Sequence, residues 1–378
     1  MPDEKLITSR GGKALRRGWT TGSCAAAASQ AAAVLLLTGI APPEIHLHTP
    51  GGITFCLPVE DAHMSGNAAV CTVRKDAGDD PDITNGVRIT ASVRRIEKGV
   101  AIEGGAGVGR ITRPGLAMPV GEAAINPGPR QQIADAVHRA AEQNGYGGGF
   151  SVTISVKDGE ALAAQTYNGH LGIVGGISIL GTSGIVEPMS EKALVDTIRL
   201  ELDSLYAQGQ RIAFLCPGNY GADFARDTLG LDLERAVKCS NFIGEAFDHA
   251  AYRGYPEILL VGHAGKLVKM AAGVMNTHSS VADARQEIFT AHAALCGAPH
   301  ETLEGLMAAI SVDACVELLD EVDLRQPVLS RIGREMENRI ALRMKGQARV
   351  EFIMFTGKYG VLAESAGARA LCERLKLQ

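Results

Sequence analysis

The sequence predicts an α+β and α/β protein in two parts. A strand-rich N-terminal α+β domain spans residues 1–187, and a C-terminal α/β domain with a mainly parallel, Rossmann-like sheet spans residues 188–378. Alternating polar and apolar segments in the first third of the chain indicate half-buried strands. Three wholly apolar segments in the second half, each followed by a glycine-rich loop, indicate a parallel sheet covered on both faces.

Composition narrows the class of protein. At 378 residues the chain has room for two or three domains, and 46% hydrophobic residues, 4% aromatic residues and 45 glycines favour close small-residue packing. The formal net charge of -5 excludes a general attraction to nucleic acid. Eight scattered cysteines, without a C-x-x-C pair or metal-ligand spacing, are typical of a reduced cytoplasmic protein. We therefore expect a cytoplasmic protein.

The first element is a helix over residues 24–37, rich in alanine and leucine. Thr21 or Ser23 can cap its start, and Thr38 with Gly39 provides its end. Twin arginines before an apolar segment resemble an export signal, but this segment contains two polar residues and is too short to span a bilayer. We interpret it as an internal helix and expect no membrane partner.

The start of this helix is also a predicted anion site. Unpaired N–H groups and the positive end of the dipole favour anions at a helix N-terminus. Arg16 and Arg17 precede the small residues Thr20, Thr21, Gly22 and Ser23. The alternative is an ordinary capped helix that packs closely through its alanines.

Strands follow over residues 44–48, 53–59, 68–74 and 87–93, with a turn at 50–52 and an acidic loop at 75–82. The glycine-rich segment 104–110 lacks the dinucleotide-binding spacing because Arg110 occupies the position of the last glycine. We expect a loop there, then a helix over 131–144 and a strand over 150–156.

The second half begins with a helix over about 190–208. Strands are expected at 212–216, 258–261 and 352–355, each leading through a glycine loop into a helix; the loops are 217–221, 262–266 and 356–360. Because ligands bind at the carboxyl ends of parallel strands, these loops are the predicted ligand crevice.

Eight segments resemble the S-adenosylmethionine-dependent cobalt-precorrin-5B C1-methyltransferases of the anaerobic cobalamin pathway. They are GWTTGSCAA (18–26), KDAGDDPD (75–82), NPGPR (126–130), GTSGIV (181–186), PGN (217–219), SNFIG (240–244), GHAGKL (262–267) and NTHS (276–279). They occur in order over nearly the whole chain. Trp19 stands where we expect tyrosine in this family, and both side chains offer a flat apolar face.

The resemblance implies transfer of a methyl group from S-adenosylmethionine to C1 of a cobalt-bearing tetrapyrrole, giving cobalt-precorrin-6A. Cobalt would arrive with this anionic substrate, so we expect the protein to hold no metal of its own. Other enzymes of the pathway and further copies of the chain remain open as partners. Two other functions also remain open: a small-molecule kinase that binds phosphate at the helix start, and a tetrapyrrole carrier without catalysis.

The chemistry of these substrates selects the predicted site residues. Carboxylate arms of the macrocycle require cations and N–H donors, and Trp19 can lie against the ring. The predicted substrate-binding residues are Arg16, Arg17, Trp19, Thr20, Thr21, Gly22, Ser23, Lys75, Arg130 and Lys266. For Lys269, a solvated helix position is favoured over a contact.

Histidine titrates near neutrality, so His263 and His278 are the predicted general bases. The residues predicted to bind S-adenosylmethionine are Asp76, Asp79, Gly218, Asn219, Asn241 and Gly262. A carboxylate of the acidic loop can hold the ribose diol or the ammonium group of the donor; the alternative is a solvated turn. Cys24 is expected to be a small helix residue and no nucleophile.

Overall fold

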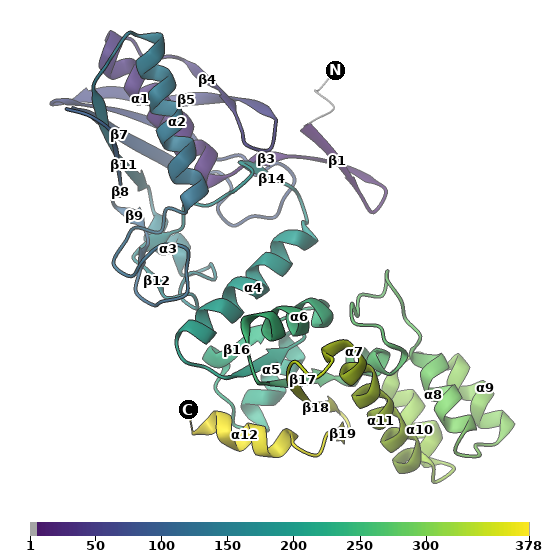
Figure 1. Ribbon diagram of the computed structural model, residues 1–378. Coiled ribbons are helices and arrows are strands. Elements are labelled where there is room, and N and C mark those ends of the chain that lie inside the picture. Colours follow the sequence, from purple (N-terminus) through teal and green to yellow (C-terminus); the bar gives the residue numbers. More distant parts are fainter. Residues whose placement is uncertain (1–5, 378) are drawn as a thin grey trace. The chain divides into compact units, whose positions relative to one another are not determined.

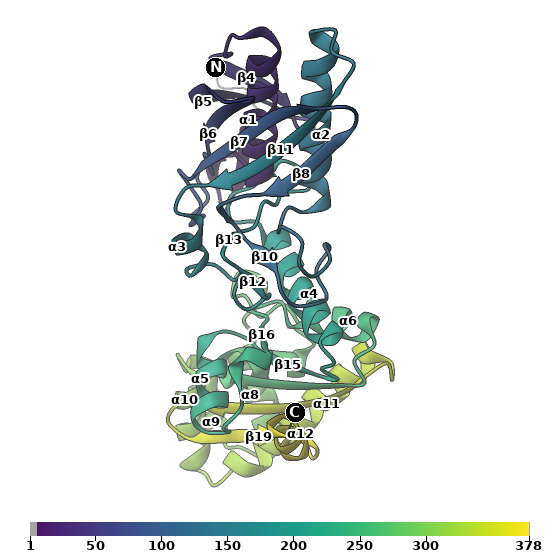
Figure 2. The ribbon, with the colours of Figure 1, turned by 90° about the vertical axis from the view of Figure 1, so that its left-hand side faces the viewer.

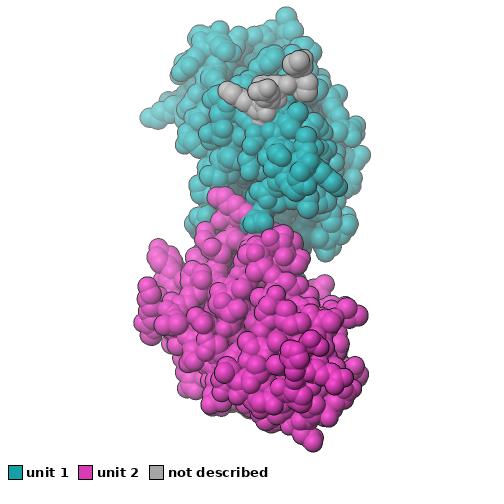
Figure 3. Space-filling view, turned by 90° about the vertical axis from the view of Figure 1, so that its right-hand side faces the viewer, with its two compact units in different colours: residues 1–191 teal, residues 192–378 magenta. Residues whose placement is uncertain are grey.

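The structure, a computed structural model, describes residues 6–377. The chain divides into two compact units, unit 1 over Met1–Glu191 and unit 2 over Lys192–Gln378 (Figure 3). The division lies four residues after Glu187, where we placed the domain boundary. Each unit has its own hydrophobic core and is described by itself.

Unit 1 consists of many strands and three helices among its described residues (Figure 1). They are β1 (Ile7–Arg10), β2 (Lys13–Arg16), β3 (Gly18–Trp19), α1 (Thr21–Thr38), β4 (Glu44–His48), β5 (Thr54–Ser65), β6 (Ala68–Arg74), β7 (Arg88–Ile96), β8 (Val100–Gly104), β9 (Gly107–Val108), β10 (Arg110–Ile111), α2 (Pro127–Gln143), β11 (Gly149–Val156), α3 (Gly159–Ala163), β12 (Ile173–Val174), β13 (Gly176–Ile177) and β14 (Ile185–Val186).

A six-stranded sheet in the order β4-β5-β6-β7-β11-β8 forms the centre of unit 1. Its strands are antiparallel except for β11 and β8, which run parallel. Helices α1 and α2 pack together against one face (Figure 2). Along β7, Ile89, Ala91 and Val93 are buried while the residues between them are not, so the period-two pattern of the sequence predicts which face meets the helices.

Helix α1 is the core helix of unit 1. Its N-cap is Thr20 and neither of the predicted caps, Thr21 and Ser23, because the Thr20 side chain accepts the Ser23 N–H. Gly39 ends the helix at φ 77°, as expected, and donates its N–H to Leu35. Among the described residues, α1 has the length and composition of a membrane span, but 78% of it is buried inside the unit. Cys24 is fully buried on it, and burial raises the pKa of its thiol, so it has a packing role.

Helix α4 (Glu191–Ala207) leads into unit 2. The elements that follow are β15 (Ile212–Cys216), α5 (Asn219–Asp227), β16 (Ala236–Lys238), α6 (Ile243–Arg253), β17 (Glu257–His263), α7 (Ala264–Leu267), α8 (Arg285–Ala294), α9 (His300–Ala308), α10 (Val312–Asp320), α11 (Arg325–Met344), β18 (Arg349–Thr356), β19 (Gly360–Glu364) and α12 (Ala368–Lys376), with short 3₁₀ turns at Leu233–Arg235 and Val268–Ala272.

The sheet of unit 2 has the order β16-β15-β17-β18-β19, with four parallel strands and an antiparallel β19 at one edge. Alternate residues of each central strand enter two separate cores. One contains α4, α6 and α11, and the other contains α5 and α12. The mainly parallel sheet covered on both faces is therefore present. The order is not the 3-2-1-4-5-6 of a Rossmann sheet, so that finer description is not confirmed.

One predicted strand-to-helix loop is wrong. Residues 356–360 connect β18 to β19 as an antiparallel hairpin, in which Thr356 pairs with Gly360 and Gly360 has φ 67°. A glycine loop after an apolar strand can form either a hairpin or a crossover connection. Here the antiparallel pairing of β19 with β18 makes it a hairpin. The helices α8, α9 and α10 had not been predicted.

Candidate functional site

The N-terminal motif and the acidic loop of unit 1 bind each other. The Arg16 guanidinium donates to both carboxylate oxygens of Asp76, at 2.7 and 2.8 Å, and the Arg16 N–H donates to Asp79 at 2.6 Å. The Arg16 guanidinium holds the pKa of Asp76 below its ordinary value. These residues were predicted for two different ligands, and the structure makes them partners. Arg16 nevertheless keeps 49% of its side chain exposed.

Two glycines allow this contact. A Cβ on Gly18 would lie 2.2 Å from the carbonyl carbon of Ala77, and a Cβ on Gly78 would lie 2.1 Å from the carbonyl oxygen of Arg16. Gly78 also has φ +68°, which favours glycine. The two backbones therefore interlock, and no larger residue fits at either position without moving one of them.

Lys75 is a structural cation. Its side chain is 3% exposed and forms an ion pair with Asp82, while Nζ lies 2.5 Å from the hydroxyl of Thr84. Burial raises the pKa of Asp82, but the Lys75 charge and the hydrogen bonds outweigh burial and leave it below its ordinary value. Lys75 is therefore enclosed and paired within unit 1, and its predicted contact with a ligand carboxylate stays a prediction.

The start of α1 is enclosed in the same manner. Thr20, Thr21 and Ser23 are at most 5% exposed. The Gly22 N–H donates to the carbonyl of Leu180 at 3.0 Å, and the Ser23 N–H donates to the Thr20 hydroxyl at 3.2 Å. The Thr21 hydroxyl accepts the Leu180 N–H at 2.9 Å. The chain itself therefore uses the donors that we had predicted for an anion, and these four residues have structural roles.

Three other predicted substrate contacts also have partners within unit 1. Arg130 donates to two backbone carbonyls at 3.0 Å each. Trp19 donates its indole N–H to a backbone carbonyl at 3.1 Å and meets Phe55 edge to face at 5.6 Å. Arg17 pairs with Glu187 at 3.3 Å. For Arg130 in particular, the two carbonyls take the donors that a carboxylate would need.

In unit 2, the loops after β15 and β17 lie together at the carboxyl edge of the sheet. β15 and β17 are neighbours in the sheet. The strand that follows β15 in sequence, β16, lies on one side of this pair, and the strand that follows β17, β18, lies on the other. Doubly wound sheets bind ligands at such a reversal of strand order. A Cβ on Gly262 would lie 2.7 Å from Pro217, and one on Gly218 would lie 3.5 Å from Lys266 Nζ. Gly218, Gly262 and Lys266 thus lie together in this loop pair, although the two glycines were predicted to bind the donor and Lys266 the macrocycle.

His263 caps α7 in this loop pair. Its Nδ1 accepts the Gly265 N–H at 3.1 Å. Burial lowers the pKa of the imidazole, with a smaller opposing effect from Asp313, so the ring is neutral near pH 7 and carries its proton on Nε2. The rings of Tyr220 and Phe355 lie 6.0 and 5.7 Å away. In this arrangement His263 is a hydrogen-bond donor through Nε2, and its assignment as a general base stays a prediction.

Asn241 and His278 belong to a second group of contacts. The Thr277 N–H donates to the Asn241 carbonyl at 3.0 Å, and the exposed His278 accepts the Ser280 N–H on Nδ1 at 3.2 Å. Lys269 is buried and donates to the Thr277 carbonyl at 3.2 Å, so the solvated position expected for Lys269 is wrong. His278, like His263, uses Nδ1 to hold its own loop.

Two charged residues, Lys238 and Glu201, were not predicted from the sequence. Lys238, at the end of β16, donates to the Asn219 side chain at 3.2 Å, and Lys266 donates to the Ser240 carbonyl at 3.4 Å. Burial raises the pKa of Glu201 on α4 to about 7, against the opposing charge of Lys238, so this carboxyl exchanges protons near neutrality. Lys238 is adjacent to a motif and was detectable. Glu201 lies within an amphipathic helix pattern, which gives no such signal.

Comparison with known proteins identifies relatives over most of the chain. A family model described as CbiD matches residues 8–188, and one described as the CbiD C-terminal domain matches residues 276–366. A protein of Ruminiclostridium cellulolyticum is 50% identical and covers 92% of this chain and 90% of its own length. One of Alkaliphilus metalliredigens is 43% identical, with coverages of 97% and 96%. Both are named cobalt-precorrin-5B C(1)-methyltransferase.

A solved structure is also similar. It is the crystal structure of a cobalamin biosynthesis protein (cbiD) from Archaeoglobus fulgidus, with 32% sequence identity and a TM-score of 0.41. The match covers 75% of this chain and 88% of that one.

Proposed function

Because the chain belongs to the CbiD family, we propose that it methylates C1 of cobalt-precorrin-5B in anaerobic cobalamin biosynthesis, giving cobalt-precorrin-6A. One observation carries the proposal: relatives 50% and 43% identical over 92% and 97% of this chain bear that name. S-adenosylmethionine is the methyl donor in this proposal. Cobalt arrives with the substrate, and the reaction takes place in the cytoplasm.

The donor site is assigned to the loops after β15 and β17. The position at the reversal of strand order supports this assignment, as do the polar groups gathered there. Tyr220 is 78% exposed and offers a flat face to the adenine, while His263 Nε2 and the Asn219 amide offer donors to its polar edges or to the ribose. The Lys266 ammonium is the partner for the carboxylate of the methionine part.

Methyl transfer from a sulfonium requires placement more than covalent help. The nucleophilic ring carbon attacks the methyl group in line, the carbon–sulfur bond breaks, and the sulfur keeps its electron pair. Most of the acceleration then comes from holding the two reactants at near-attack distance in a site poor in water. The residues of the loop pair therefore act by binding and orienting the donor. In unit 1, the exposed part of Arg16 is the proposed contact for a carboxylate arm of the macrocycle.

The structure gives no support to a kinase that binds phosphate at the start of α1, because the Gly22 and Ser23 N–H groups donate within unit 1. A tetrapyrrole carrier would release its ligand unchanged, whereas a methyltransferase would release a methylated product. Incubation with methyl-labelled donor and cobalt-precorrin-5B without oxygen should give labelled product. Absence of label in the tetrapyrrole after incubation would reject the methyltransferase function.

A calorimetric titration tests the donor site separately. We expect Asn219→Ala and His263→Ala to weaken binding of S-adenosylmethionine about tenfold or more. Matched controls are Asn338→Ala and His300→Ala, which change exposed residues on other helices of unit 2. Unchanged affinity in both test variants, with labelled product still formed by the wild type, would move the donor site elsewhere and leave the proposed reaction standing.

A further inference from the structure

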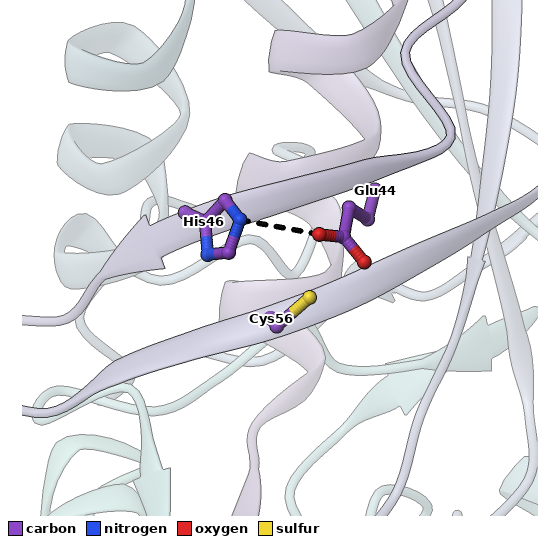
Figure 4. Close-up of side chains that lie close together, drawn as sticks. All are labelled: Glu44, His46 and Cys56. Atoms are coloured by element: carbon purple, nitrogen blue, oxygen red, sulfur yellow. Dashed lines mark ion pairs between the residues drawn. The ribbon is translucent and has the colours of Figure 1, made fainter.

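A glutamate, a histidine and a cysteine meet on the edge of the six-stranded sheet of unit 1 (Figure 4). They are Glu44 and His46 of β4 and Cys56 of β5. One potential ligand atom from each side chain lies within 4.8 Å of the other two, and all three side chains are exposed. His46 Nε2 lies 3.2 Å from Glu44 Oε1.

The hairpin places these residues together. Glu44 and His46 are two positions apart on β4 and therefore share a face, while the alternating residues Ile45 and Leu47 point into the core. The register pairs His46 directly with Cys56 on β5. Such pairs have Cβ atoms about 5 Å apart. The register of the β4–β5 hairpin therefore brings the three side chains together, so their proximity does not depend on the conformations of long, flexible side chains.

Cys56 differs from the other cysteines of the chain. All eight lie within residues 6–377; six are buried, Cys296 is partly buried, and Cys56 is exposed. A thiolate, an imidazole and a carboxylate are the three ligand types that zinc uses in proteins. Ligand atoms at zinc distances of about 2.0–2.3 Å lie roughly 3.5 Å from one another. Small side-chain rotations on a fixed hairpin bring the three atoms to that spacing.

We propose that Glu44, His46 and Cys56 bind one zinc-like divalent cation at this sheet edge, with water as the fourth ligand. On binding, the Cys56 thiol releases its proton to solvent, the imidazole binds through Nε2, and the carboxylate exchanges its contact with His46 for one with the metal. The ion joins β4 to β5 outside the core. The site goes beyond the methyltransferase function, does not depend on it, and replaces our expectation that the protein holds no metal.

The test uses the untagged full-length protein after treatment with a chelator. Titration with Zn²⁺ should give one ion per chain, and Co²⁺ in its place should give a thiolate-to-cobalt charge-transfer band. We expect Cys56→Ser to remove that band and to weaken Zn²⁺ binding at least tenfold, and His46→Ala to weaken it by a similar factor. The matched controls, Cys296→Ser and His63→Ala, should bind as the wild type does.

Two results would overturn the proposal. One is absence of stoichiometric Zn²⁺ binding by the wild type, which would make the cluster a set of surface hydrogen bonds. The other is Cys56→Ser binding Zn²⁺ with wild-type affinity, which would place the ion elsewhere. Because the substituted side chains are exposed, the variants should fold, and Trp19 fluorescence during urea unfolding verifies that unit 1 is intact.

Discussion

The buried pair of Lys75 and Asp82 predicts an asymmetric response to loss of either partner. Lys75 is 3% exposed, whereas Asp82 is 24% exposed. Asp82→Ala leaves a buried ammonium with the Thr84 hydroxyl beside it, and breaking a buried pair costs about 3–5 kcal/mol. Because Asp82 is partly solvated, we expect the lower end, about 3 kcal/mol. Lys75→Met should cost only about 1 kcal/mol, since Asp82 keeps the Thr84 N–H and hydroxyl at 2.7 Å and reaches water.

Urea unfolding followed by tryptophan fluorescence measures this difference in unit 1 alone. Trp19 is the only tryptophan of the chain, and its indole N–H donates to the carbonyl of Arg74, next to Lys75. The control is Lys98→Met, which removes an exposed lysine of the same unit and should leave the urea midpoint unchanged.

The pH dependence has a definite sign. Because the pKa of Asp82 is lowered in the folded state, its stabilising contribution is present above the ordinary aspartate pKa and disappears as the pH falls through the lowered value. The gap between wild type and Asp82→Ala should therefore narrow in acid. The reasoning is refuted if Lys75→Met costs as much as Asp82→Ala. It is also refuted if Lys75→Met leaves stability unchanged but weakens tetrapyrrole binding.

Gly18→Ala should destabilise unit 1 by more than about 2 kcal/mol because the added Cβ would lie 2.2 Å from a backbone atom. The control, Gly147→Ala, adds a Cβ in open space, so its urea midpoint should stay close to that of the wild type. Thr21→Val should cost about 1–3 kcal/mol in the same assay because it leaves the Leu180 N–H unpaired; an unchanged midpoint with weaker tetrapyrrole binding would restore a ligand role. Burial lowers the pKa of His263 below the ordinary 6.5, so the imidazole becomes protonated only at a pH below 6.5, and the rate of methyl transfer should decline there. Part of that decline should be absent in His263→Asn, whose amide can still cap α7; an identical pH–rate profile would argue against this role.

Local patterns predicted the elements whose environment is uniform along their length. Helix α1 is mostly apolar, is buried over most of its length and ends at Gly39, and the middle of β17 is apolar because helices cover both of its faces. Elements decided by distant partners escaped prediction. The hairpin at Gly360 forms because β19 pairs with β18, and nothing in residues 356–360 distinguishes that turn from a crossover loop. The Glu44, His46 and Cys56 cluster was hidden similarly, since its spacing becomes regular only when the β4–β5 register is known.

Several residues of unit 1 that were predicted to bind ligands have partners within the chain, and the cause is the same for each. Arg16 was predicted to meet a ligand carboxylate, and it meets the carboxylate of Asp76, sixty positions along its own chain. Both carboxylates present the same chemistry to a guanidinium, so residue type alone cannot separate the two cases. The glycines can separate them: Gly18 and Gly78 each lie where a Cβ would strike the backbone of the opposite motif. A glycine within each of two oppositely charged motifs therefore favours packing of one motif on the other. In the loop pair of unit 2, by contrast, Gly218 faces the ammonium of Lys266, and a charged group beside an open glycine favours a ligand.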